Sequence, residues 1–298
     1  MQNNKTYYYG GHMSIKNGII SAIINMNKIG GNMIQVFISN PMSIKFSIDN
    51  TKFNDKICKQ IQTTLLNTDS KIVIHLPYVI NLAKPLLSII GNCWWIKMIC
   101  NQLLISESIG SIGCVVHVGK YIELTPDEGI NNMYNGLKYV IEFIKINELK
   151  THIILETAAG QGTELITTKN NSLEEFANFY NRFDIHDKLH IRICIDTCHI
   201  FAAGYDIRLK SQVKTFFNEF HNLIGIQYID LIHLNDSKTI CGSCVDRHEC
   251  LGQGKIGLKG LKHIIRYSIY NQIPIILETP SDYIYELELI NKLKNQIG

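Results

Sequence analysis

Residues 71–75 read Lys-Ile-Val-Ile-His, a short apolar run that ends in a residue able to bind a metal ion. Similar runs, each as long as a buried strand, recur along the chain. Most are separated by about 40 residues, the length of one strand–helix unit in a large barrel. The pattern predicts eight strands: Thr6–Gly10, Met33–Phe37, Lys71–His75, Gly113–His117, His152–Glu156, Arg192–Asp196, Tyr228–His233 and Pro274–Glu278.

Segments with helical spacing lie between most of these runs. Thr125-Pro126-Asp127-Glu128 combines an N-cap, a proline at the first helical position and early acids. Helices are predicted at Ile89–Leu104, Ile130–Ile146, Ser211–Phe220 and Gly260–Tyr270, and another opens at Ser172-Leu173-Glu174-Glu175. Alternating strands and helices indicate an α/β fold with a parallel sheet.

Eight such units favour a TIM-type (β/α)8 barrel, formed as a single domain by residues 1–298, with a metal site at its C-terminal face. The alternative is an open, doubly wound sheet. That alternative is less favoured because no Gly-x-Gly-x-x-Gly follows the first predicted strand.

Composition places few limits on function. The 298 residues are 46% hydrophobic and 18% charged, which is typical of a soluble globular protein. The sequence has neither a secretory signal pattern nor a membrane-length apolar run, so we expect an intracellular, cytoplasmic or nuclear protein with reduced thiols. The net charge of +3 permits a polyanionic partner without requiring one.

Potential metal ligands end six of the predicted strands: His75, His117, Glu156, Asp196, His233 and Glu278. The C-terminal strand ends of a barrel surround one mouth, so these side chains are expected to converge. Unpaired acids and imidazoles would be unfavourable there, whereas divalent cations would stabilise them. Mixed histidine and carboxylate ligation suits zinc, manganese or iron. His199, Asp246 and His248 lie just beyond strand ends and add three further ligands.

Several long motifs surround these residues. They are Gly11–Ser14, Glu156–Gly162, Cys194–Asp206, His233–Lys238, Val245–His248 and Leu251–Gly257. In this order they resemble the signature segments of the endonuclease IV family of apurinic/apyrimidinic (AP) endonucleases. The resemblance extends from Tyr9 to Leu293, nearly the whole chain.

The resemblance implies three zinc ions per chain. His75, His117 and Glu156 would hold the first. Glu156 would bridge to a second ion, held also by Asp196, His233 and Glu278. His199, Asp246 and His248 would hold the third.

The expected reaction is hydrolysis of double-stranded DNA 5′ to an abasic site, giving a 3′ hydroxyl and a 5′ deoxyribose phosphate. Metal-bound hydroxide would attack the phosphorus. Glu156 and Glu278 are expected to orient or deprotonate the nucleophile. The family also trims blocked 3′ ends, and we expect this chain to act as a monomer.

Loops at the same mouth are expected to bind DNA. Tyr78 occupies the position of a family tyrosine that inserts into the base stack, with Val79 beside it as an apolar wedge. Met42 stands where the family commonly has an arginine that enters the stack, and as an apolar side chain it is a candidate wedge at that position. Further candidate contacts are Gln161, Arg247, Lys255, Lys120 and Lys238.

Two other functions fit parts of the pattern. A sugar isomerase or epimerase would share the barrel and a metal site, but it would typically use fewer ions and lack the pair Asp246 and His248. A non-catalytic DNA-binding protein would be marked by lost ligands, and none of the nine is missing. Cys241 and Cys244, with Cys250, form a weak zinc signal, for which free thiols are the favoured interpretation. We expect Cys198 to face away from the metals, and His12 to lie beside them or in the core.

Overall fold

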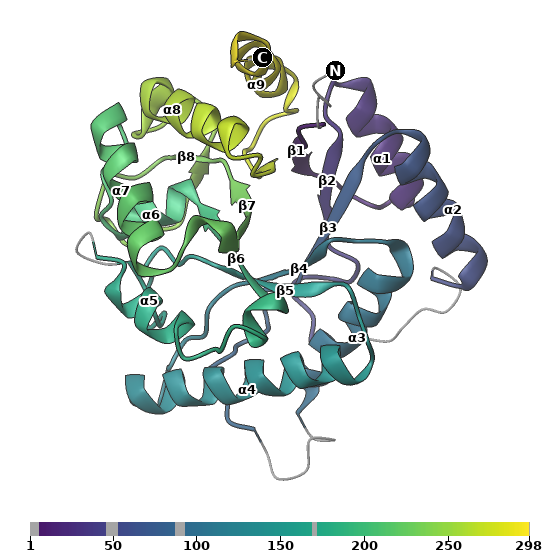
Figure 1. The fold of residues 1–298 in the computed structure, drawn as a ribbon, viewed down its shortest axis with the longest axis vertical. Coiled ribbons are helices and arrows are strands. Elements are labelled where there is room, and N and C mark those ends of the chain that lie inside the picture. Colours follow the sequence, from purple (N-terminus) through teal and green to yellow (C-terminus); the bar gives the residue numbers. More distant parts are fainter. Residues whose placement is uncertain (1–5, 46–52, 87–92, 169–171, 298) are drawn as a thin grey trace.

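Eight parallel strands close into a barrel in the computed structural model, which describes residues 6–45, 53–86, 93–168 and 172–297 (Figure 1). Their order around the barrel is β1-β10-β7-β6-β5-β4-β3-β2. The strands are β1 (Tyr9–His12), β2 (Met33–Val36), β3 (Lys71–His75), β4 (Gly113–Val116), β5 (His152–Glu156), β6 (Ile191–Asp196), β7 (Ile229–His233) and β10 (Ile275–Leu277). The predicted TIM barrel is therefore confirmed.

The strand bounds differ from prediction mainly at the chain start. The sequence predicts the first strand at Thr6–Gly10, but β1 runs from Tyr9 to His12. Its pairing with β10 begins only at Tyr9, and its pairing with β2 begins only at Gly10. β4 and β10 each stop one residue before the predicted end, so His117 and Glu278 directly follow their strands.

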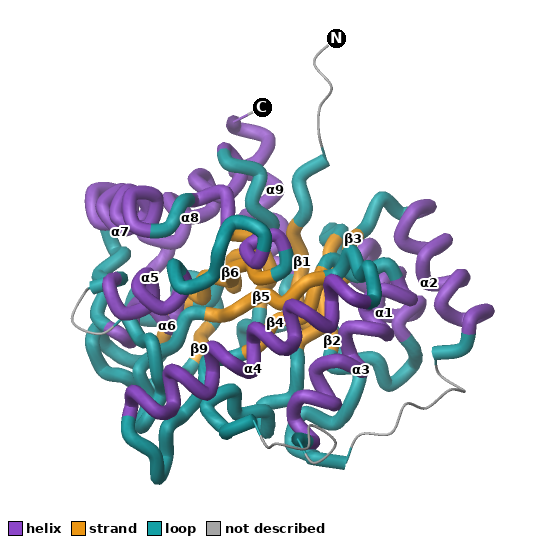
Figure 2. The backbone as a smooth tube through the Cα atoms, turned by 60° about the horizontal axis from the view of Figure 1, so that its bottom comes forward, coloured by secondary structure: helices purple, strands orange, loops and turns teal. Residues whose placement is uncertain are grey.

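Nine α-helices surround the strands within the described residues (Figures 1 and 2). They are α1 (Ile19–Lys28), α2 (Asp55–Asn67), α3 (Trp94–Ile109), α4 (Pro126–Ile146), α5 (Glu174–Tyr180), α6 (Thr197–Ala203), α7 (Lys210–Leu223), α8 (Gly257–Tyr270) and α9 (Ile284–Ile297). None of these helices is both long and apolar enough to cross a membrane.

Local sequence explains how α4 begins. The Thr125 hydroxyl accepts the Glu128 N–H at 3.3 Å, and the Glu128 carboxylate accepts the Thr125 N–H at 2.8 Å, which completes a capping box. The predicted start of α3 at Ile89 lies outside the described residues. The helix continues past Leu104 and ends at Ile109, where Gly110 caps it with a φ of 73°. The sequence pattern does not predict helices α1, α2, α6 and α9.

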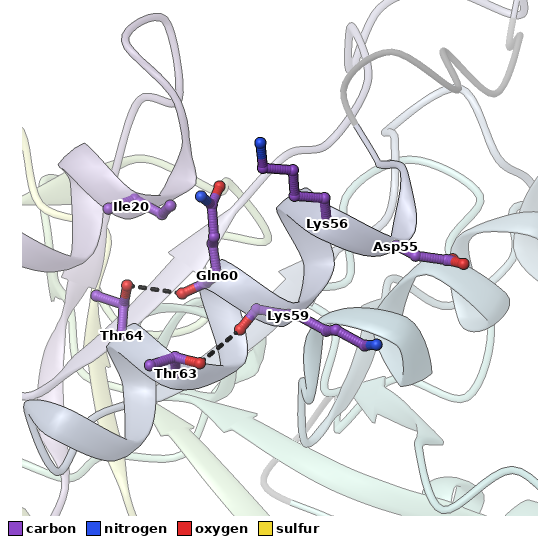
Figure 3. A pocket seen from close by; sticks show the side chains of 7 residues that line it. All are labelled: Ile20, Asp55, Lys56, Lys59, Gln60, Thr63 and Thr64. Atoms are coloured by element: carbon purple, nitrogen blue, oxygen red, sulfur yellow. Dashed lines mark hydrogen bonds between the residues drawn. The ribbon is translucent and has the colours of Figure 1, made fainter.

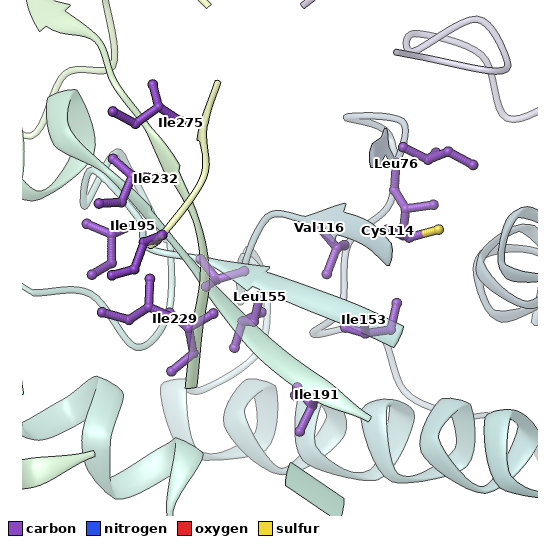
Figure 4. Close-up of a cluster of buried hydrophobic side chains, with 14 of the residues drawn as sticks. Leu76, Cys114, Val116, Ile153, Leu155, Ile191, Ile195, Ile229, Ile232 and Ile275 are labelled. Carbon is purple, nitrogen blue, oxygen red and sulfur yellow. The ribbon is translucent and has the colours of Figure 1, made fainter. Parts of the chain in front are cut away.

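The barrel has two apolar layers. Outward-facing side chains such as Ile153, Leu155 and Ile195 pack in a large core between strands and helices (Figure 4). A smaller cluster fills the interior: Met33, Val73, Val115, Ile154, Cys194, Leu231 and Ile276. This division follows from the two-residue period of a strand.

The same period positions the polar side chains at the mouth. Two residues beyond each interior apolar residue, the next inward position lies one layer nearer the C-terminal strand end. These positions are Gln35, His75, His117, Glu156, Asp196, His233 and Glu278. The barrel therefore changes within one layer from apolar packing to a polar ring. A two-stranded antiparallel ribbon beside it, β8 (Asp236–Ser237) and β9 (His248–Glu249), brings in His248.

Candidate metal centre

The first ligand group joins β3, β4 and β5. The Nε2 atoms of His75 and His117 each lie 3.4 Å from Oε2 of Glu156. One ligand atom from each of the three residues lies within 4.8 Å of the other two. This spacing can hold one ion, and the three residues are those expected for the first zinc.

The second group uses the other oxygen of Glu156. His233 Nδ1 lies 2.9 Å from Glu156 Oε1, 3.2 Å from Glu278 Oε2 and 3.9 Å from Asp196 Oδ2. These four residues form a candidate metal-binding group. Because the two oxygens of Glu156 face different groups, its carboxylate is placed to bridge two ions.

The third group depends on loops and on α6. Asp246 lies 3.2 Å from both His199 and His248, through one oxygen each. Asp196 also approaches this group, with Oδ2 3.5 Å from His248 Nε2. Its other oxygen caps α6 by accepting the His199 N–H at 2.8 Å. Asp196 therefore faces both the second and third groups, which the sequence did not predict.

Three of the candidate histidine ligands are oriented by a hydrogen bond between their Nδ1 atom and a backbone carbonyl. Nδ1 of His75 donates to the Leu76 carbonyl at 2.8 Å, and Nδ1 of His199 donates to the Thr157 carbonyl at 2.8 Å. His248 Nδ1 lies 3.3 Å from the Glu278 carbonyl oxygen. Each bond leaves Nε2 facing the carboxylates, the arrangement usual for metal-binding histidines.

Unpartnered atoms test whether this ring fits metal ions. Among the described residues, Oε2 of Glu156 and the Nε2 atoms of His199 and His248 are buried without a hydrogen-bond partner. Buried polar atoms of this kind are unfavourable unless something pairs with them. All three atoms belong to candidate ligands and lie within the ligand groups described above. Divalent cations would pair with them, so this set of donor atoms fits divalent cations.

The acids and imidazoles also shift one another's pKa values. Burial opposes ionisation of Glu156, but the neighbouring imidazoles, His117 foremost, outweigh it and hold the pKa of this carboxyl well below its ordinary value. Burial likewise opposes charge on His248, yet Asp196 and Asp246 raise the pKa of its imidazole to about 9. The carboxylates thus favour positive charge in the site, and a bound cation can take the place of imidazole protons.

A cavity of about 510 Å³ opens onto these groups. Its walls include the candidate ligands His117, His199, Asp246, His248 and Glu278. Five predicted DNA contacts also line it: Tyr78, Val79, Lys120, Gln161 and Arg247. Tyr78 is 52% exposed, and its ring centre lies 5.5 Å from those of His75 and His117.

The other predicted DNA contacts are placed differently. Met42 is 72% exposed in the loop after β2, and Lys255 and Lys238 are exposed, but none of the three lines the cavity. Within the cavity, the Lys120 ammonium lies 3.4 Å from a carboxylate oxygen of Glu164.

The structure also reveals participants that were not predicted. Gln35 and Asn235, both fully buried, hydrogen-bond to candidate ligands. Gln35 has a sequence signal, because it stands two residues after the interior Met33. Ile122 and Lys84 line the cavity from loops, and no strand period predicts them.

The cysteines contribute little to the candidate metal groups. None of the nine cysteines forms a disulfide, and no candidate metal group among the described residues includes Cys241, Cys244 or Cys250. Cys198 was expected to face away from the metals, but its sulfur lies within 4.8 Å of ligand atoms of Asp246 and His248. The short helix α6, which was not predicted, turns Cys198 toward that group.

A larger surface depression of about 760 Å³ lies elsewhere, on α1 and α2 (Figure 3). There the Thr63 and Thr64 hydroxyls donate to carbonyls of their own helix, at Lys59 and Gln60. This surface gathers no ligand group among the described residues. The chemistry of the molecule therefore centres on the smaller cavity at the barrel mouth.

Comparison with known proteins agrees with this geometry. Residues 24–295 match the family described as xylose isomerase-like TIM barrel. A relative from Acanthamoeba polyphaga mimivirus, named for endonuclease 4, is 36% identical over 283 residues, which cover 92% of this chain and 86% of the relative. Apurinic-apyrimidinic endonuclease 1 of Plasmodium berghei (strain Anka) is 32% identical over 307 residues, covering 96% of this chain and 55% of that protein.

Solved structures share the fold. Endonuclease IV from Thermus thermophilus has a TM-score of 0.77 at 24% identity, covering 97% of this chain and 99% of that chain. A D-tagatose 3-epimerase-like protein has a TM-score of 0.69 at 18% identity, covering 97% of each chain. The barrel alone is thus common to nucleases and epimerases, and the sequence relatives distinguish them. On that ground the chain belongs to the endonuclease IV family.

Proposed function

We propose that this protein is a metal-dependent AP endonuclease of base excision repair. It hydrolyses the phosphodiester 5′ to an abasic site in double-stranded DNA, leaving a 3′ hydroxyl and a 5′ deoxyribose phosphate, and it trims blocked 3′ ends. The observation that carries the proposal is the convergence of nine histidine and acidic side chains, in three groups, beside one open cavity. The names of the sequence relatives support the same activity.

The cofactor we propose is zinc, with three ions per chain; manganese or iron is chemically suitable at some positions. Bound divalent cations lower the pKa of water to about 7 and neutralise charge on a phosphate. The residues would divide as the resemblance implies: His75, His117 and Glu156; then Glu156, Asp196, His233 and Glu278; then His199, Asp246 and His248.

The two glutamates differ in access, which suggests different roles. Glu278 lines the cavity and its side chain is 12% exposed, whereas Glu156 is 1% exposed and lies behind the histidines. Burial opposes ionisation of Glu278, but His233 and His12 together hold its pKa well below the ordinary value. Because Glu278 reaches the cavity and its carboxylate stays ionised, we assign to it the orientation of the attacking water, whose hydrogen bond it accepts. Glu156 holds the cations.

The cavity walls support a nucleic-acid substrate. Lys84, Lys120 and Arg247 bring positive charge to the mouth, where a phosphate backbone would pass. Tyr78 presents an aromatic ring that can stack on a base. An abasic nucleotide is already unstacked, so drawing it into the cavity costs less than flipping an intact base.

Incision of a defined duplex tests the proposal. Purified protein supplied with zinc is incubated with a duplex carrying one tetrahydrofuran abasic analogue, and the metal content is measured in parallel. We expect one cut 5′ to the analogue, with a 3′ end that a polymerase extends. Absence of incision by protein that holds zinc would reject the proposal and would favour the sugar isomerase alternative.

Two matched variants test the division of roles. Glu278→Gln and Glu156→Gln should each lower incision by roughly 100-fold or more, because the first removes the group that orients the water and the second removes a ligand of the cations. Binding of abasic DNA should largely survive in both. Glu156→Gln should lose more zinc than Glu278→Gln, since Glu156 faces two ligand groups and Glu278 faces one. Equal zinc loss in both variants would contradict the assignment.

A further inference from the structure

Gln35 is a fully buried amide in the layer of candidate metal ligands. It lies on β2, a strand that supplies no ligand, and it faces inward two residues beyond Met33. Its Nε2 lies 2.6 Å from Oε1 of Glu278 and 3.1 Å from Nδ1 of His12. Its Oε1 lies 2.9 Å from Nε2 of His233.

These contacts determine which way the amide faces. An ionised carboxylate only accepts hydrogen bonds, so the group next to Glu278 is the NH₂ of Gln35. The same NH₂ lies 3.1 Å from His12 Nδ1, which is placed to accept its second N–H. The amide oxygen is thereby assigned to His233, whose Nε2 must be the donor.

This assignment determines the role of Nδ1, the other ring nitrogen of His233. With Nε2 holding the proton for Gln35, Nδ1 is the nitrogen that faces Glu156, Glu278 and Asp196. A ring rotated by half a turn, or the other tautomer, would set an N–H where a ligand lone pair is required.

Gln35 differs in kind from the other anchors of the ring. His75, His199 and His248 are anchored by backbone carbonyls, which no substitution removes. The acceptor for His233 belongs to a side chain, and the same side chain also holds Glu278. One substitution can therefore release two members of the second ligand group.

We propose that Gln35 is a positioning residue of the metal centre. It fixes the tautomer and ring orientation of His233 and holds Glu278 toward the same ion, without contacting the ion or the substrate. This inference rests on the proposed function, because it requires that the second ligand group binds a cation.

Zinc retention tests the inference. Parent protein and Gln35→Met, which keeps the side-chain length but removes all three hydrogen bonds of the amide, are loaded with zinc and titrated with a chelator. We expect Gln35→Met to release one equivalent of zinc at roughly 10- to 100-fold lower chelator concentration, the range found for such supporting residues. Gln102→Met is the matched control, because Gln102 is equally buried and bonds to Ser39 instead of a ligand. The control should release zinc as the parent does.

A spectroscopic signature separates positioning from general structural damage. In histidine-labelled, zinc-loaded parent protein, long-range ¹H–¹⁵N spectra should show His233 with a slowly exchanging Nε2–H. This signal should disappear in Gln35→Met and persist in Gln35→Glu, which keeps an acceptor opposite His233. If Gln35→Met fails to fold, Gln35→Glu still tests the inference by itself. It keeps the acceptor for His233, so loss of the His233 Nε2–H signal in this variant would contradict the inference.

The outcomes distinguish the two proposals. A parent protein that binds no zinc would overturn the proposed function itself. A parent that binds zinc, with zinc release and the His233 signal unchanged in Gln35→Met, would overturn only the role of Gln35. Equal loss of zinc in Gln102→Met would reduce that role to core stability.

Discussion

The backbone N–H of Gly254 donates a 3.1 Å hydrogen bond to Oδ2 of Asp236, a carboxylate that is fully buried. Further backbone N–H groups donate to the same carboxylate from Ser237, Gly252, Ile256 and Gly257. Hydrogen bonds to a charged acceptor are the stronger kind, and together they fold the loop that follows β9 around one anion. We call Asp236 and these five N–H donors the Asp236 hub. Because β9 carries His248, this hub also holds the third ligand group in place.

Gly254→Ala should disrupt this hub. A Cβ at position 254 would lie 2.4 Å from Oδ1 of Asp236 and 2.5 Å from the Ser237 carbonyl oxygen, so the loop must shift. We expect a loss of about 1–3 kcal/mol in the free energy of unfolding, measured by urea denaturation. Gln253→Ala, at the exposed neighbouring position, should change the free energy by less than about 0.5 kcal/mol. Equal effects in the two variants would argue against the hub.

A buried acid away from the mouth gives a pH-dependent prediction. Asp187 is 1% exposed, with its two oxygens 2.6 Å from Lys138 and 2.9 Å from Lys145. Burial raises the pKa of this carboxyl, but the two lysines outweigh burial and set it below the ordinary value. Asp187→Asn should lower the free energy of unfolding at pH 7 by about 1–3 kcal/mol.

The sign of the pH effect follows from the lowered pKa. The Asp187 carboxylate contributes its full stabilisation above the unfolded-state pKa of about 3.9, and the contribution fades as the pH falls through the lower folded-state value. The difference between parent and Asp187→Asn should therefore be constant above about pH 5 and shrink below about pH 4. Glu142→Gln, at a half-exposed partner of Lys145, should show little difference at either pH. A parent–variant gap that stays unchanged at pH 3 would refute the linkage.

The barrel and most of its site could be predicted because each depends on local patterns. Lys71–His75 and His152–Glu156 fold as strands with the predicted bounds. The strand period then places His75 and Glu156 on the inner face, so their convergence needs only a closed barrel.

What escaped prediction depends on packing between distant segments. Gln35 is not a ligand type, and its role depends on bonds to His233 and Glu278, more than 190 residues away in sequence. The approach of Asp196 to the third group depends on the loop that carries His248. Strand periodicity places Gln35 on the inner face of the barrel, but it does not predict which side chains Gln35 bonds to or how closely Asp196 approaches His248.

Tyr78 is predicted to act on DNA binding without affecting the metals. Its ring packs edge-on against His75 and His117 and leaves about half of its surface open to the cavity mouth. Tyr78→Ala should weaken binding of a duplex with a tetrahydrofuran site by roughly 5- to 100-fold, as loss of one base-stacking aromatic does. Zinc content should stay at the parent level.

The matched control for Tyr78 is Tyr270→Ala. Tyr270 is 81% exposed and ends α8, at the end of the barrel where β10 begins, opposite the mouth. Its loss should leave DNA affinity unchanged in the same fluorescence-anisotropy measurement. Parent-like binding by Tyr78→Ala would remove that ring from the recognition surface.

Ile122 holds an unusual conformation at the same mouth. Its φ is 49°, in the left-handed region that β-branched residues rarely adopt, and its side chain is 63% exposed. Bonds on both sides hold the turn: Asn81 pairs with the backbone of Lys120 at 2.8 Å in both directions, and the Tyr121 N–H donates to the Thr163 carbonyl at 3.0 Å. Strain held in this way is typical of binding sites.

Ile122→Gly should therefore weaken DNA binding without lowering the stability of the fold. Glycine adopts positive φ freely, so relief of a strain of about 1–2 kcal/mol should keep the free energy of unfolding at or above the parent value. Loss of the apolar side chain from the cavity wall should nevertheless weaken abasic-duplex binding by roughly 10- to 100-fold, about the contribution of one aliphatic side chain that becomes buried on binding. Glu148→Gly relieves a similar φ of 52° at an exposed position at the end of α4, away from the cavity, and should leave DNA binding unchanged. If Ile122→Gly binds DNA as tightly as Glu148→Gly does, the strained turn serves only to close the loop.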